Sequence, residues 1–170
     1  MKIEQLSEQQ AKPLLPQLIG LLQDSVGNGA SVGFLPPLEF DVAEKYWLET
    51  LNEVSQGKRL LLVSNENGNV LGMVQLALVT KPNALHRAEV QKLVVHTRFR
   101  NRGIARALMK AAEDSARKEG RTLLVLDTEQ DSGAEELYVK CGYTRAGVIP
   151  HYALGADRSF ISTVVFYKLI

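Results

Sequence analysis

The first forty residues contain a short segment in which polar and apolar residues alternate, then apolar residues that recur at helical spacing, and then a segment with neither pattern. Residues 2–6 alternate polar and apolar positions like a short edge strand. Leucines then recur at helical spacing after Pro13, at positions 14, 18, 21 and 22. Residues 27–37 hold three glycines and two prolines, which interrupt both periods. This pattern predicts a strand, a helix and then an extended loop.

The next segment predicts a second helix followed by a β-hairpin. Asp41 and Glu44 have the spacing of a capping box that would open the helix. The apolar face of that helix would be formed by Ala43, Trp47, Leu51 and Val54. Residues 60–64 and 70–79 are apolar and flank a polar turn with an Asn-Gly pair at 67–68, which is typical of two antiparallel strands.

Residues 88–126 have the pattern of a strand, a helical crossover and a second strand. Residues 88–95 are rich in valine and predict a strand. The following helix would bury Ile104, Leu108, Ala111, Ala112 and Ser115, and would expose Arg106, Lys110, Glu113 and Arg117. Gly120 stands where a residue that ends the helix is expected. Residues 123–126 are continuously apolar, as in a buried strand parallel to the strand at 88–95.

The C-terminal part predicts one short helix and one strand. Ser132 and Glu135 have capping-box spacing, and Gly142 would end the helix that they open. Residues 161–169 are β-branched and aromatic, as in a strand. No internal repeat or low-complexity linker divides the 170 residues, so we expect one domain. The order of elements predicts an α/β fold on a mixed, mostly antiparallel sheet.

Composition excludes several kinds of partner. The formal net charge is only +1, so no global field would attract nucleic acid or an anionic membrane surface. The apolar stretches are too short to span a bilayer. Cys141 is the only cysteine, and the N-terminus lacks the regions of a signal peptide. We therefore expect a cytoplasmic protein that binds neither nucleic acid nor membrane, and we assign no residue to a metal.

The strongest candidate for chemistry is the segment that joins the valine-rich strand to the next helix. Gly103 allows the backbone to approach a ligand closely, and the helix after it would direct free N–H groups and its positive end at one place. Four arginines add local positive charge: Arg98, Arg100, Arg102 and Arg106. The segment predicts an anion site. The alternative is a tight turn with a solvated arginine face.

Residues 100–105, Arg-Asn-Arg-Gly-Ile-Ala, resemble the Gln/Arg-x-x-Gly-x-Gly/Ala pyrophosphate loop of the GNAT (N-acetyltransferase) superfamily. The resemblance implies acetyl-coenzyme A as cofactor, and a sheet of about seven strands with a splayed parallel pair and about four helices. It implies cofactor contacts from Arg100, Asn101, Arg102, Gly103, Ile104, Ala105 and Arg106. In that family the preceding strand is bulged, so that backbone groups, here of Leu93, Val94 and Val95, bond the pantetheine arm and polarise the thioester carbonyl.

Residues 134–143 resemble the last helix of the same family and the strand after it. The resemblance places Tyr138 where a residue commonly protonates the departing thiolate, and a tyrosine hydroxyl is a proton donor at neutral pH. The alternative is that Tyr138 packs in the core, as aromatic side chains on short helices commonly do. Asp131 departs from the family, in which asparagine is frequent there. Because a carboxylate repels phosphate, Asp131 is given no binding role.

Acylation of an amine also needs a base, because an ammonium ion has no lone pair. Glu89 on the valine-rich strand and Asp127 at the end of the parallel strand could both face the cleft, where desolvation would raise the pKa of each carboxyl. The alternatives are a surface ion pair of Glu89 with Arg87 or Lys92, and a turn role for Asp127. His86 is a further candidate base.

A closer resemblance, to the tabtoxin-resistance acetyltransferases, rests on five segments in the same order: 30–34, 81–83, 87–93, 126–129 and 143–145. That subgroup acetylates the amine of a β-lactam amino-acid toxin, and carboxylates at the positions of Glu89 and Asp127 are proposed to act there. The resemblance implies a small amino-acid-like amine as acceptor. Candidate acceptor contacts are Phe34, His86, Arg145, His151 and Tyr152, of which the arginine could bind a carboxylate.

Two other functions stay open, namely acetylation of proteins or peptides and a non-catalytic acyl-coenzyme A sensor. A peptide acceptor needs an open groove, whereas the loop at 27–37 predicts a covered site. The nearly neutral chain also offers no extended acidic groove for a lysine-rich tail. The candidate acid and bases argue against a sensor. Whether the protein forms a homodimer is also left open.

Overall fold

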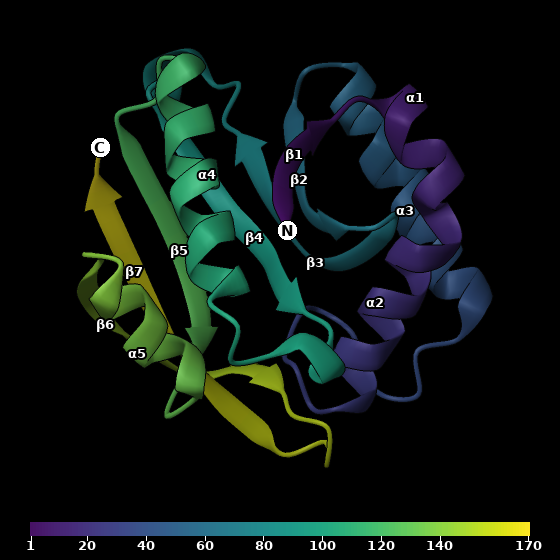
Figure 1. Cartoon of the computed structure of the whole chain (residues 1–170). Helices are drawn as coiled ribbons and strands as arrows, with labels where there is room; N and C mark the ends of the chain where they lie inside the picture. Colours follow the sequence, from purple (N-terminus) through teal and green to yellow (C-terminus); the bar gives the residue numbers. More distant parts are fainter.

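The computed structural model describes residues 1–170 and is built on one seven-stranded sheet with the order β1-β2-β3-β4-β5-β7-β6 (Figure 1). The strands are β1 (Lys2–Leu6), β2 (Arg59–Glu66), β3 (Asn69–Leu78), β4 (Arg87–Val95), β5 (Leu123–Glu129), β6 (Thr144–Leu154) and β7 (Phe160–Leu169). Every neighbouring pair is antiparallel except β4 and β5, which are parallel. The predicted fold class is confirmed.

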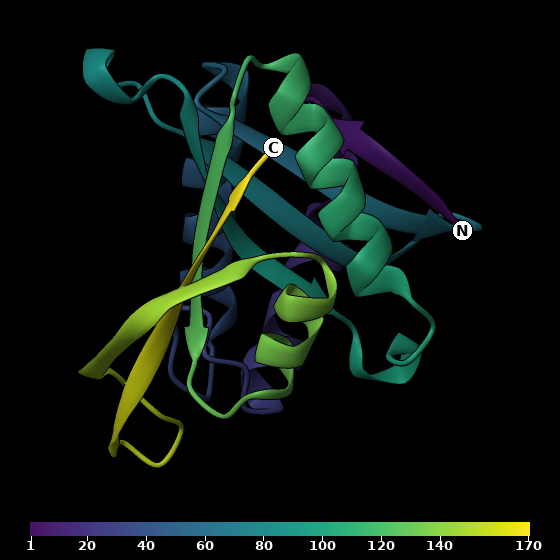
Figure 2. The same ribbon diagram turned by 90° about the vertical axis from the view of Figure 1, so that its left-hand side faces the viewer.

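Helices cover both faces of this sheet (Figures 1 and 2). One face carries α4 (Ile104–Lys118) and α5 (Gly133–Lys140), and the other carries α1 (Glu8–Ala11), α2 (Leu15–Gly27) and α3 (Phe40–Ser55). Short 3₁₀ turns lie at Lys12–Leu14, Pro82–Ala84 and Thr97–Phe99. None of the helices combines the length and the apolar composition needed to cross a membrane.

The sheet separates two hydrophobic cores, because side chains on its central strands alternate between the faces. On β2, Leu60 and Leu62 join the core under α4, whereas Leu61 and Val63 join the core under α2 and α3. Trp47 of α3 is fully buried in the second core. Burial of each such side chain contributes about 1.5–3 kcal/mol, so the two cores hold the sheet as a firm frame for side chains at its edge.

The hairpin between β2 and β3 has the predicted turn. Asn67 and Gly68 have φ values of 53° and 81°, the left-handed pair that a type I′ turn requires. The helices α4 and α5 also end just before the two glycines that the sequence indicated, Gly120 and Gly142. Local turn signals therefore predicted these boundaries correctly.

The two predicted capping boxes are wrong. The residue before α3 is Glu39 and the residue before α5 is Ser132, and neither side chain bonds its helix. The carboxylate of Glu135 instead accepts a hydrogen bond from the N–H of Asp131 at 2.6 Å. Tertiary packing outweighs local capping at α3, since Trp47 on its buried face has no exposed surface.

Two other predictions fail at the C-terminal strands. The pattern places Glu113 on the exposed face of α4, but the residue is 8% exposed and its carboxylate accepts hydrogen bonds at 2.8 Å from the ammonium of Lys168 on β7. The patterns also predict no strand at residues 144–154, where β6 lies. This edge strand leaves most side chains exposed and contains Gly147 and Pro150, so it shows no alternation.

The feature that opens the sheet is β4, which is paired with β5 only at its start. Three residue pairs join the two strands, and the last is Glu89 with Val125; beyond it the strands separate (Figure 1). Opposite β3, Lys92 and Leu93 together face one residue, which is a β-bulge, and Lys92 has a φ of 51°. The bulge and the split leave backbone groups of β4 without a strand partner on the β5 side.

Candidate active site

Two cavities lie at the split between β4 and β5. The first, here called the arginine-loop cavity, has a volume of about 640 Å³ and is lined mainly by residues 93–106 and by α5. The second, here called the carboxylate cavity, has a volume of about 390 Å³ and contains Glu89, Asp127 and Glu129. Leu93 and Tyr138 line both cavities, so the two spaces meet at these side chains.

The arginine-loop cavity brings together most of the residues that the loop motif indicates. Gly103, at a φ of 74°, precedes α4 with no side chain capping the helix, so the first N–H groups of α4 are free for a ligand. The residues of the motif and of β4 that line the cavity are Leu93, Val94, Val95, Arg100, Asn101, Gly103, Ile104, Ala105 and Arg106. Arg102 does not line it, because its guanidinium pairs with the Glu66 carboxylate at 3.0 Å.

The loop of this cavity is held from the far side by Asp24 of α2. The Asp24 carboxylate accepts hydrogen bonds at 2.8 Å from both the backbone N–H and the hydroxyl of Thr97. The next residue, Ser25, lines the cavity with a buried hydroxyl that has no partner in the chain. No sequence signal pointed to these two residues, because the contact spans 73 positions.

These features fit a long ligand with a phosphate group at one end. Free N–H groups at a helix start and the charges of Arg100 and Arg106 suit the phosphate. The unpaired backbone of β4 and the unsatisfied hydroxyl of Ser25 suit amide groups along an extended arm. The residues present therefore match the needs of a coenzyme A molecule.

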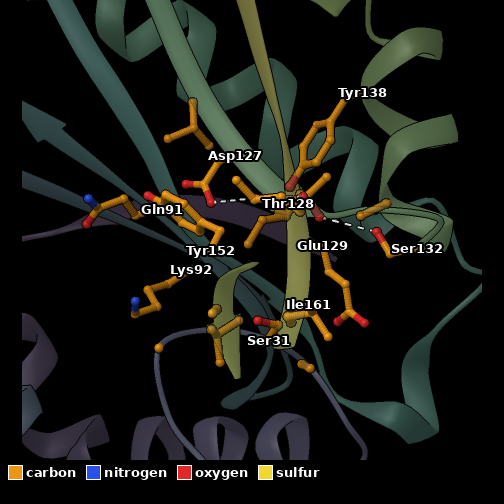
Figure 3. A pocket seen from close by; sticks show the side chains of 18 of the residues that line it. Ser31, Gln91, Lys92, Asp127, Thr128, Glu129, Ser132, Tyr138, Tyr152 and Ile161 are labelled. Carbon is orange, nitrogen blue, oxygen red and sulfur yellow. Dashed lines mark hydrogen bonds between the residues drawn. The ribbon is translucent and has the colours of Figure 1, made fainter. Parts of the chain in front are cut away.

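Tyr138 lies in the wall between the cavities. Its ring is 7% exposed and packs against Tyr143 and Phe166, with ring centroids 6.0 and 5.9 Å away. Burial, with a further contribution from the charge of Asp127, raises the pKa of Tyr138 to about 12. The hydroxyl has no hydrogen-bond partner in the chain and points toward Asp127 and Thr128 (Figure 3). It therefore keeps its proton at neutral pH and is free to donate it.

The carboxylate cavity places two candidate bases on adjacent strands. Glu89 is half-buried on β4 and Asp127 is exposed to the cavity at the end of β5. The hydroxyl of Thr163 lies 2.8 Å from the Asp127 carboxylate and 2.9 Å from the carbonyl of Thr128. Tyr152 lines the same cavity, and the negative charge of Asp127 raises the Tyr152 pKa.

Lys92 is the cationic member of this cavity, and no sequence signal assigned it a role there. Its ammonium lies over the rings of Phe34 and Tyr46, at 5.9 and 5.7 Å from their centroids. Gln91, its neighbour, accepts a hydrogen bond from Arg59 at 2.7 Å. Figure 3 shows Lys92 on the side of the cavity away from Tyr138.

The loop after α2 forms part of the wall of this cavity. Residues 29–33 line the carboxylate cavity, and residues 28–30 also line the arginine-loop cavity. Phe34 does not line either one. It packs edge-on against Tyr46, with centroids 5.2 Å apart, and borders a neighbouring third cavity of about 350 Å³.

Three other candidate residues lie outside both cavities. His86 is exposed just before β4, at the end of the strand opposite the split. His151 is exposed and stacks on Phe160, with centroids 5.1 Å apart. Arg145 pairs with Glu135 at 3.8 Å. Among the candidate acceptor contacts, only Tyr152 lines the carboxylate cavity.

Comparison with known proteins identifies similar sequences and folds. Residues 31–143 match the sequence model of the acetyltransferase (GNAT) family. An uncharacterized N-acetyltransferase from the hisH-hisA intergenic region of Azospirillum brasilense is 30% identical over an alignment of 121 residues that covers 68% of each chain.

Two solved structures superpose over nearly the whole chain. A ribosomal-protein-alanine N-acetyltransferase from Brucella melitensis is 20% identical, with a TM-score of 0.80 and coverage of 100% of both chains. A putative acetyltransferase from Salmonella typhimurium, solved with its cofactor acetyl-CoA, is 19% identical, with a TM-score of 0.80 and coverage of 99% of this chain and 93% of that one. At such low sequence identities, the superposition shows a shared fold only.

Proposed function

This chain belongs to the GNAT acetyltransferase family, and on that premise we propose that it acetylates the amine of a small amino-acid-like molecule by direct transfer from acetyl-coenzyme A in a ternary complex. One observation carries the proposal. The arginine-loop cavity and the smaller carboxylate cavity meet at a buried tyrosine whose hydroxyl has no hydrogen-bond partner in the chain.

The arginine-loop cavity is the proposed cofactor site. The residues of 100–106 that line this cavity, all except Arg102, bind the phosphates together with the free N–H groups at the start of α4. The backbone of β4 at Leu93, Val94 and Val95, which has no strand partner on the β5 side, binds the pantetheine arm. Bound acetyl-coenzyme A supplies an acetyl group activated as a thioester. The Salmonella typhimurium neighbour, which shares this fold, was solved with the same cofactor.

The two carboxylates and the tyrosine move protons on either side of the reacting acetyl group. Glu89 or Asp127 accepts the proton of the acceptor ammonium, directly or through water, and so frees its lone pair. Tyr138 donates its proton to the departing thiolate; burial raises the pKa of Tyr138 to about 12, so the hydroxyl carries its proton at neutral pH. Each group thus stands at the cavity where its proton is needed.

A small acceptor is favoured over a protein. The carboxylate cavity has a volume of about 390 Å³, and residues 29–33 form part of its wall. The terminus of a folded protein acceptor therefore has little room to enter it. The resemblance to the tabtoxin-resistance acetyltransferases points to an amino-acid-like guest as well. The alternative is a protein or peptide acceptor, since the Brucella melitensis neighbour is named a ribosomal-protein-alanine N-acetyltransferase.

The test is thiol release from acetyl-coenzyme A in the presence of amino acids, amino-acid β-lactams, polyamines and short peptides. We expect at least one amino-acid-like compound to be the best acceptor, with initial-rate lines that intersect as direct transfer requires. Peptides or polyamines as the best acceptors would overturn the substrate class. Parallel lines would overturn direct transfer. Tight cofactor binding without release from any acceptor would favour a sensor.

A further inference from the structure

The ammonium of Lys92 is a cation in the carboxylate cavity without an anionic partner. No carboxylate lies within 4.0 Å of its Nζ atom, and the group makes no hydrogen bond within the chain. Its neighbours are the faces of Phe34 and Tyr46 and the loop at Gly33. Burial, with the charge of Arg59 as a smaller cause, lowers the pKa of Lys92. A partly buried charge left unpaired in this way favours the binding of an anion.

The bulge in β4 is what places this side chain. Ala88 and Val90 point into the core under α4, and regular alternation would send Lys92 into the same core. The extra residue reverses the alternation, because Val94 lies in the opposite core and Leu93 packs toward α4. The left-handed backbone at Lys92 thus turns its side chain to the face that carries Phe34 and Tyr46.

We propose that Lys92 binds the carboxylate of the acceptor, which makes the acceptor an amino acid or a close analogue with a free acid group. The proposal rests on the proposed function and names the part of the acceptor that the cavity selects. It replaces Arg145, whose guanidinium lies outside both cavities beside Glu135.

The cavity holds the carboxylates of Glu89, Asp127 and Glu129 and the ammonium of Lys92, so its charges match a molecule that carries both an amine and an acid. Glu89 and Asp127 attract the ammonium of the acceptor, and both carboxylates also act on Lys92 from across the cavity. Arg59 is the other cation near Lys92, and its guanidinium is already paired with Glu53 at 2.6 Å. Lys92 is therefore the cation that stays free for a carboxylate in this cavity.

A purely structural role for Lys92 predicts different behaviour. If its ammonium served only to hold Phe34 and Tyr46 in place, the loss of Lys92 would disturb the loop after α2 and weaken every acceptor equally. An anchor role weakens only acceptors that carry a carboxylate. Paired acceptors that differ in this group alone separate the two roles.

The kinetic experiment compares L-methionine with L-methioninamide and L-lysine with L-lysinamide near neutral pH, where the Lys92 ammonium stays charged, with rates and KM expressed per free amine. For Lys92→Met we expect KM for the acids to rise about ten- to a hundredfold, with KM for the amides and kcat nearly unchanged. Lys92→Arg should restore part of the preference, and Lys81→Met, which removes an exposed charge elsewhere, should change nothing. Equal effects on acids and amides would overturn the proposal while the acetyltransferase activity stood.

A second readout needs no turnover. In protein saturated with coenzyme A, the ¹³Cε signal of Lys92 reports its pKa, and we expect L-methionine to raise that pKa toward its ordinary value while L-methioninamide leaves it unchanged. If no acceptor is acetylated, the proposed function fails, and this titration still decides whether Lys92 binds a carboxylate. The same response to both ligands, or to neither, would overturn the assignment.

Discussion

The arginine-loop cavity and the carboxylate cavity share Tyr138, but the chain builds them in different ways. The first is lined mainly by one continuous stretch, residues 93–106, which contributes backbone groups and arginines. The second collects side chains from the loop after α2, from α5 and from four strands, β4, β5, β6 and β7. A ligand that is common to a family can be held by a local motif, whereas selection among acceptors needs charges brought together from distant positions.

This difference implies that substitutions in the two cavities have separable effects. Changes in the arginine loop should alter cofactor binding and leave the acceptor preference intact. Changes at Glu89, Lys92 or Asp127 should alter turnover or acceptor choice and leave cofactor binding intact. Tyr138 lines both cavities, so a substitution there is the one most able to change cofactor binding and turnover together.

The largest effect is expected at Tyr138. Tyr138→Phe removes a proton donor and little volume, so we expect kcat to fall about a hundred- to ten-thousandfold. The dissociation constant for coenzyme A, measured by calorimetry, should change little. A kcat close to that of the wild type at saturating substrates would show that the hydroxyl is structural or that water replaces it.

The pH dependence of turnover tests the same residue. A proton donor loses its effect as pH rises through its pKa, and burial raises the pKa of Tyr138 to about 12. We therefore expect kcat at saturating substrates to stay level up to about pH 10.5, past the usual tyrosine pKa of about 10. A descending limb near pH 10 that Tyr138→Phe removes would contradict the raised pKa. NMR of ¹³Cζ-labelled tyrosine measures it directly.

The next effect is expected at the two carboxylates. We predict that Glu89→Gln and Asp127→Asn each lower kcat at neutral pH, and that the variant lacking the base loses about a hundredfold. The other variant should lose less, because its residue positions the acceptor. The pH–rate profile separates them, since only loss of the base removes the acidic limb. If both variants keep the wild-type profile, the base lies elsewhere.

A loss of comparable size, but in cofactor binding rather than in turnover, is expected at Gly103 in the arginine-loop cavity. A glutamate there would put a negative charge at the proposed phosphate site and an L side chain at a φ of 74°. Coenzyme A at a hundred times its dissociation constant should stabilise the wild type by about 2.7 kcal/mol, and Gly103→Glu should abolish the resulting rise in Tm. No rise with the wild type at millimolar coenzyme A would refute the site itself.

The smallest effect is expected at Asp24, which supports the arginine loop from behind. Asp24→Asn keeps the shape of the side chain but weakens two hydrogen bonds to Thr97. We expect coenzyme A to bind about fivefold more weakly, in line with about 1 kcal/mol for one hydrogen bond. KM ratios among acceptors should not change, and a changed ratio would show that the loop after α2 couples the two cavities.

The sequence predicted the parts of the site that depend on neighbouring residues. The hairpin at Asn67-Gly68, the strand, loop and helix around Gly103, and the parallel strand that carries Asp127 all lie where local patterns indicated. The interpretation of Glu113 failed because the pattern of one helix cannot show that Lys168, 55 positions later, packs against it.

The placement of the remaining site residues depends on long-range contacts. Asp24 binds Thr97 across 73 positions, and no periodicity or motif marks such a pair. Lys92 reads as an ordinary surface residue of a strand, because a bulge changes its direction without changing the local composition. The splayed pair of parallel strands was predicted only from the resemblance to a family, and the structure confirms it.

Because Lys92 is the extra residue of a bulge, it belongs to neither side of the alternation that fills the two cores. Most other positions of β4 hold packed side chains, where a change of volume costs stability and is removed by selection. Position 92 lies outside both cores, so a change of its charge leaves the core packing intact and alters only its contacts with Phe34, Tyr46 and the loop at Gly33. Related chains should therefore be able to acquire new acceptor preferences through a single substitution at this position.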